Sequence, residues 1–174
     1  LDCDVDLYTG SESKGFLSAS ESYHHHYYYR LFENRYLTLV SYLFSQCSLF
    51  VKVLHHRNKN VVFYVNTLLP FGAALAGRLM KKEVIYHLHE IRQEPMLLKR
   101  FLRFIVSITA SKIIFVSNTM ALSESLSGIR QQVVFNALSR GFSQIALESN
   151  YEWRIDGVFS VLMVCSLKQY KGVD

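Results

Sequence analysis

The sequence predicts an α/β fold, a Rossmann-like parallel sheet with helices on both faces. Short continuous apolar runs, of which residues 61–65 (VVFYV) are the first, are typical of strands buried on both faces of a parallel sheet. Segments with apolar residues at helical spacing separate these runs. Strands that alternate with helices indicate βαβ units, which build a parallel sheet through right-handed crossovers.

The first part of the chain predicts three elements before this alternation begins. Residues 4–9 alternate between polar and apolar side chains and predict a short strand. Residues 10–30 are polar and aromatic and predict a loop. Apolar residues at helical spacing up to His56 predict a helix that begins at about Asn34.

The alternation predicts further strands at 61–65, 84–88, 113–116, 133–135 and 158–164. Prolines open two of the helices between them, at 70–80 and 95–108, because proline fits the first position of a helix. Asn118 is the predicted cap of a third helix at 119–126. One face of the first of these helices carries small side chains and predicts close packing on the sheet: Gly72, Ala73, Ala76 and Gly77.

The composition excludes several classes of protein. Half of the 174 residues are hydrophobic and 14% are aromatic, which excludes a disordered chain. The net charge of +5 comes from basic residues that are mostly scattered, whereas a nucleic-acid-binding protein carries a dense basic stripe. Three distant cysteines without a CxxC motif favour a reducing, cytoplasmic compartment. The uncharged stretch 36–51 contains several polar residues and is shorter than the ~20 apolar residues of a spanning helix, so we expect no membrane-spanning anchor.

Polar side chains follow the predicted strands at the points where the strands end. Ligand sites of open parallel sheets lie at the carboxyl ends of the strands, so these residues are the candidates for substrate contacts. They are Asn66, Thr67, His89, Glu90, Ser117, Asn118, Asn136 and Ser166.

His87 and His89 flank Leu88 on one predicted strand. Residues i and i+2 of a strand point to the same face, so both imidazoles can face one cleft. They can be two ligands of a metal, but a catalytic zinc ion needs three from the protein, and the remaining histidines have no ligand-like spacing. The alternative places His87 in the core as a packed residue. We therefore predict no metal site.

The predicted helix at 95–108 is basic and apolar over most of its circumference. Three cations lie close together on it: Lys99, Arg100 and Arg103. One interpretation is that they contact an anionic membrane surface. The other is a solvated helix face on which the long cationic side chains cover apolar surface.

Five segments together resemble the group 1 (family 4) glycosyltransferases, and most of all the capsular and exopolysaccharide enzymes of bacteria. The similarity extends from about Asp4 to Asp174. The segments that carry it are 65–72 (VNTLLPFG), 86–90 (YHLHE), 115–118 (FVSN), 133–138 (VVFNAL) and 164–173 (VCSLKQYKGV).

This resemblance implies one half of a GT-B enzyme, in which two Rossmann-like domains face each other across a cleft. Residues 1–156 would be the acceptor-side domain without its first strand, and residues 157–174 the end of the linker and the first strand of the donor-binding domain. The chain would then be a fragment cut at both ends and inactive by itself. The parent protein would be a retaining glycosyltransferase that needs no metal or other cofactor.

The resemblance also implies a substrate class and a location. The donor would be a nucleotide-sugar and the acceptor a saccharide or lipid-linked saccharide in polysaccharide biosynthesis. Work on a lipid-linked acceptor implies peripheral attachment to the cytoplasmic face of the membrane.

Individual residues match the motifs of the family. His89 matches the histidine that contacts the donor sugar near the reacting carbon, which makes it the candidate catalytic residue. Lys171 and Gly172 match the Lys-Gly pair whose lysine neutralises the donor diphosphate. Ser166 stands where the family often has an arginine, and Lys168 is the nearest substitute. Cations stabilise a departing diphosphate electrostatically, which agrees with these residue types.

Two other functions remain compatible with the residues themselves. One is a metal-dependent hydrolase that uses His87 and His89. The other is a non-catalytic Rossmann-like binding module, in which the polar strand ends hold a ligand without turning it over.

Overall fold

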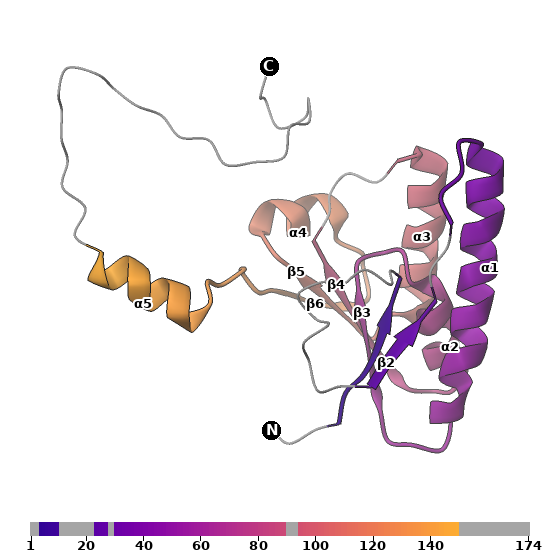
Figure 1. The fold of residues 1–174 in the computed structure, drawn as a ribbon, viewed down its shortest axis with the longest axis horizontal. Coiled ribbons are helices and arrows are strands. Elements are labelled where there is room, and N and C mark those ends of the chain that lie inside the picture. The colour runs from indigo at the N-terminus through magenta and orange to yellow at the C-terminus, as the bar shows by residue number, and fades with distance from the viewer. Residues whose placement is uncertain (1–3, 11–22, 28–29, 90–93, 150–174) are drawn as a thin grey trace. The chain divides into compact units, whose positions relative to one another are not determined.

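The computed structural model describes residues 4–10, 23–27, 30–89 and 94–149. The chain divides into two compact units, Leu1–Asn136 and Ala137–Asp174. The first unit contains a four-stranded parallel sheet in the order β3-β4-β5-β6 and a separate two-stranded parallel sheet of β1 and β2 (Figure 1). In the second unit the described residues include one helix, α5 (Arg140–Glu148), which begins with Ser139 as its cap.

The four-stranded sheet confirms the predicted succession of strands and helices. Its strands are β3 (Val62–Asn66), β4 (Glu83–Leu88), β5 (Lys112–Phe115) and β6 (Arg130–Val133). The helices that connect them are α2 (Phe71–Leu79), α3 (Met96–Thr109) and α4 (Asn118–Glu124). The parallel register is continuous: Val65 pairs with Tyr86, and Tyr86 pairs with Ile113.

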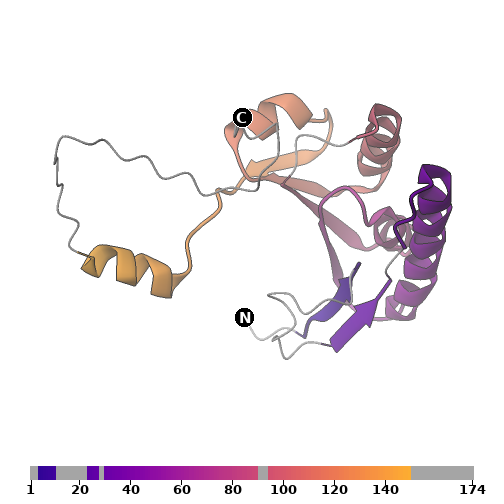
Figure 2. The same cartoon turned by 45° about the horizontal axis from the view of Figure 1, so that its top comes forward.

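Helices α1 to α4 lie on one side of this sheet, so the prediction of helices on both faces is wrong for the described part of the first unit (Figure 2). The reason is the strand order. Each strand lies beside its predecessor, and successive right-handed crossovers in one direction place every helix on the same face. Side chains alternate accordingly along β3: Phe63 and Val65 are buried, whereas Val62 and Tyr64 are 54% and 57% exposed.

Helix α1 (Arg35–Val53) continues into a 3₁₀ turn, η2 (Leu54–His56), and packs on α2. It begins at Asn34 as predicted, and the Asn34 side chain accepts a hydrogen bond from the Tyr36 N–H at 2.8 Å. The segment Arg35–His56 is long and apolar enough to cross a membrane by length and composition. A core helix of a soluble protein has the same properties when one face is buried, and 28% of the most apolar part of this segment is buried.

Two strands differ from the predictions by more than two residues. β2 (Tyr23–His26) lies inside the predicted loop and pairs in parallel with β1 (Asp6–Thr9). The prediction missed this strand because its consecutive histidines show no alternation of polar and apolar residues. β6 begins three residues before the predicted 133–135. The prediction missed its first three residues because they are polar and exposed, as the residues of an edge strand can be.

Two helices also differ. Ser117, not Asn118, caps α4: its Oγ accepts a hydrogen bond from the Met120 N–H at 3.2 Å. Because β5 ends one residue earlier than predicted, the extended backbone that a cap requires falls on Ser117. Helix α5 occupies part of the stretch between 136 and 156 for which we predicted no regular element. The predicted strand at 158–164 lies outside the described residues.

Candidate functional site

The carboxyl ends of β3 and β4 bring several of the predicted site residues side by side. Asn66 is the last residue of β3 and lies opposite His87 in the register. The next N–H, that of Thr67, donates a hydrogen bond to the His87 carbonyl at 2.9 Å. Thr67 has a φ of 74°, a left-handed conformation that is rare for a β-branched residue. Strained backbone of this kind concentrates at functional sites, which makes this turn a candidate ligand contact.

The rings of His87 and His89 lie against each other at this edge. Their centroids are 4.1 Å apart with a tilt of 43°, which confirms the prediction that the two side chains share one face. His89 is exposed beyond the end of β4, and His87 is half-buried beneath it. The site thus presents the imidazole of His89 to solvent, with the imidazole of His87 packed against it.

Tyr64 fixes the orientation of His87 from the neighbouring strand. Its Oη lies 2.6 Å from Nδ1 of His87, and burial raises the pKa of Tyr64. The phenol therefore stays protonated and donates to Nδ1. Burial and the neighbouring His89 lower the pKa of His87, so its ring is neutral at physiological pH and its proton lies on Nε2. That Nε2 is buried and has no hydrogen-bond partner among the described residues.

The role of Tyr64 could not be predicted from the sequence. It stands in a continuous apolar run, and its contact with His87 depends on the register between β3 and β4, which one sequence does not fix. The one feature of the sequence that could have indicated this role is that Tyr64 lies two residues before Asn66 and therefore on the same face of the strand.

The ends of β5 and β6 contribute less to a shared site. Ser117 uses its hydroxyl to cap α4. Asn118 is exposed as the first residue of that helix, and Asn136 is exposed after β6, at the last position of the first unit. Among the described residues, no hydrogen bond joins Asn118 or Asn136 to His89. Five predicted site residues lie outside the described residues: Glu90, Ser166, Lys168, Lys171 and Gly172.

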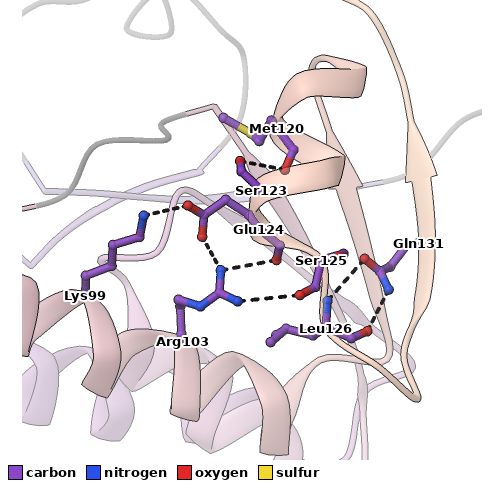
Figure 3. A network of polar contacts seen from close by, with 8 residues as sticks. All are labelled: Lys99, Arg103, Met120, Ser123, Glu124, Ser125, Leu126 and Gln131. Atoms are coloured by element: carbon purple, nitrogen blue, oxygen red, sulfur yellow. Dashed lines mark hydrogen bonds and ion pairs between the residues drawn. The ribbon is translucent and has the colours of Figure 1, made fainter.

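Two of the three cations of α3 are held in an internal ion pair. Lys99 Nζ lies 2.5 Å from Oε1 of Glu124, and Arg103 pairs with Oε2 of the same carboxylate, whose side chain is 7% exposed (Figure 3). Arg103 also donates to the carbonyls of Glu124 and Ser125 at the end of α4. Lys99 and Arg103 therefore join α3 to α4, and of the three only Arg100 is exposed.

The metal-binding interpretation of His87 and His89 finds no third ligand in the described part of the chain. The one group of three potential ligands there is Asp6, His55 and His56. These residues lie at β1 and at η2, which precedes the amino end of β3. That is the edge of the sheet opposite to His89.

Comparison with protein-family models, with curated proteins and with solved structures finds no match for this chain. The geometry supplies an exposed imidazole, a strained turn and amide side chains at the carboxyl edge of a parallel sheet. These groups can bind and polarise a polar ligand such as a sugar, and an imidazole can also transfer a proton.

Proposed function

We propose that this chain is the acceptor-side part of a retaining glycosyltransferase that transfers a sugar from a nucleotide-sugar to a saccharide or lipid-linked saccharide. In this proposal residues 1–156 bind the acceptor, and residues 157–174 lead into a donor-binding domain that holds the diphosphate. The resemblance of five segments to such enzymes motivates the proposal. The enzyme would act in polysaccharide biosynthesis at the cytoplasmic face of the membrane.

The observation that carries this proposal is the arrangement of His89. It stands exposed at the carboxyl edge, against a neutral His87 that Tyr64 orients. A transferred sugar develops positive charge at its anomeric carbon, so polar groups that touch the sugar bind more strongly in the transition state. An imidazole that packs against a second ring loses less freedom when it makes that contact than an imidazole without neighbours does.

Replacing His89 with alanine in the enzyme that includes the donor-binding domain is expected to lower kcat about a hundredfold, because a transition-state contact of ~3 kcal/mol is lost. Donor affinity should change much less. Steady-state kinetics with varied nucleotide-sugar measures both quantities. His55→Ala is the matched control, since His55 is also exposed but lies before the amino end of β3. A His89→Ala enzyme with normal kcat and only a raised KM would contradict the assigned role.

The membrane part of the proposal rests on the outer face of α3. Exposed apolar side chains recur there at helical spacing around Arg100: Leu97, Phe101, Phe104 and Ile108. An anionic membrane attracts one nearby cation by ~1 kcal/mol, and burial of apolar side chains adds to this. Lys99 and Arg103 contribute little, because they already neutralise Glu124.

Replacing Arg100 with glutamine is expected to weaken binding of the chain to anionic vesicles about fivefold, the equivalent of ~1 kcal/mol. Co-sedimentation at low and high salt measures it, and the binding of the parent chain should fall as salt rises. Arg57→Gln removes the same charge from an exposed turn after η2 and serves as the control. Equal binding by Arg100→Gln and the parent would remove α3 from the membrane contact.

A further inference from the structure

A cluster of polar side chains joins β1 to the end of α1, far from His89. Asp6 comes from β1, and His55 and His56 come from η2. One ligand atom of each lies within 4.8 Å of the others. Tyr8 of β1 also contacts the cluster: its Oη lies 3.1 Å from Nε2 of His56, 48 residues further along the chain.

His55 is oriented in the way that metal-binding histidines are. Its Nδ1 lies 2.6 Å from the carbonyl oxygen of Lys52. A carbonyl only accepts, so Nδ1 carries the proton and the lone pair is on Nε2. Metal-bound histidines usually donate their other N–H to a carbonyl or carboxylate in just this manner, which fixes the ring and its tautomer. His55 is also exposed, which gives an ion a path from solvent.

His56 and Asp6 supply the buried side of the cluster. The Asp6 Oδ2 lies 3.4 Å from Nε2 of His56, whose side chain is 7% exposed. Ligand atoms around a tetrahedral zinc ion lie roughly 3.3 Å apart, so this pair has the required separation. The second ring nitrogen of His56, Nδ1, is buried without a hydrogen-bond partner in the described part of the chain. The ring centroids of His55 and His56 are 3.8 Å apart. The ligand atoms of the three residues lie within 4.8 Å of one another, so the exposed His55 must move closer to the other two when the ion binds.

We propose that Asp6, His55 and His56 form a binding site for a zinc ion, with a water molecule as the fourth ligand. Two imidazoles and one carboxylate are a common ligand set for zinc, and imidazole disfavours magnesium and calcium. Zinc replaces the hydroxyl of Tyr8 as the partner of His56. Tyr8 then donates to the carboxylate of Asp6 and orients it, as groups around metal ligands commonly do.

The role of this site is to fasten β1 to the main body of the unit. The β1–β2 sheet is only two strands wide, and a two-stranded sheet is marginally stable by itself. A zinc ion that bridges Asp6 and η2 stabilises the folded form, because the three ligands come together only when the chain is folded. The site is independent of the proposed transfer reaction, since it lies at the opposite edge of the sheet from His89.

The test is zinc titration of the tag-free 174-residue chain against a chromogenic chelator, together with thermal unfolding. We expect one zinc ion per chain, a Kd in the micromolar range or below, and a rise of Tm with zinc but not with magnesium. His55→Gln and Asp6→Asn are each expected to weaken zinc binding at least tenfold. Both residues reach solvent, so these variants should keep the fold.

His89→Ala is the matched control, because it removes a histidine from the other histidine pair and should leave zinc binding unchanged. Zinc binding by His55→Gln and Asp6→Asn that equals that of the parent overturns the proposal. Loss of binding in His89→Ala alone also overturns it and places the ion at His87 and His89. His56→Gln should lose binding as well, but His56 is buried, so the variants of the exposed His55 and the partly exposed Asp6 decide the result if that variant fails to fold.

Discussion

Replacing Gly72 with alanine is expected to destabilise the first unit by roughly 3 kcal/mol or more, at or above the top of the usual range for overpacking. A Cβ at Gly72 would lie 2.2 Å from the backbone oxygen of Gln46, inside α1. A backbone oxygen within a helix cannot move aside alone, so α1 and α2 would have to separate. The Gly72 N–H would also lose its 3.1 Å hydrogen bond to Oε1 of the buried Gln46. Urea unfolding followed by circular dichroism measures the effect.

Gly77→Ala is the matched control on the same helix. Its Cβ would meet side chains instead of backbone, Val84 Cγ2 at 2.9 Å and Phe63 Cγ at 3.1 Å, so these side chains must shift but no helix backbone has to move. Both variants make the same glycine-to-alanine change on one helix, so a much larger loss at position 72 would report the contact with the Gln46 backbone. A Gly72→Ala chain at least as stable as Gly77→Ala would show that α1 does not pack on α2 this closely.

These glycines show what one sequence can and cannot predict about packing. Small residues on one helix face predicted a close approach to the sheet, and Gly77 makes that approach against Val84 and Phe63. Gly72 faces α1 instead. Small side chains signal close packing but do not identify the partner, because the direction of each position depends on where the neighbouring helix lies.

For the strands too, the features that depend on neighbouring residues in the sequence could be predicted, and those that depend on distant segments could not. The positions of β3, β4 and β5 could be predicted because each contains a short run of apolar residues. Their parallel direction could be predicted because a helix lies between each strand and the next. The coverage of only one face could not be predicted, since strand order depends on pairing and not on local pattern. The Rossmann-like prediction is thus confirmed at the level of a parallel sheet flanked by helices.

The candidate site divides in the same way. The shared face of His87 and His89 followed from the two-residue period of a strand, which is local. The contact of Tyr64 with His87, the pairing of Lys99 and Arg103 with Glu124, and the meeting of Asp6 with His55 and His56 each join separate elements. Such contacts depend on register and on helix placement, and the sequence showed only that the residue types were present.

The ion pair in Figure 3 leads to the second large expected effect. Replacing Lys99 and Arg103 together with methionine should destabilise the unit by about 3–5 kcal/mol, because the buried carboxylate of Glu124 would remain without a cation. For the same reason, replacing all three cations of α3 at once would damage the fold, so such a variant cannot test membrane binding. Urea unfolding of the double variant measures the loss.

Adding Glu124→Leu to the double variant should recover most of this stability, since a well-packed apolar cluster replaces a buried ion pair at little net cost. Arg100→Met is the matched control: it removes a neighbouring exposed cation and should change the free energy of unfolding by less than about 0.5 kcal/mol. The comparison separates loss of charge compensation from loss of side-chain volume. If the triple variant is no more stable than the double variant, the cations of α3 contribute through packing alone, and Glu124 is not the group that holds α3 to α4.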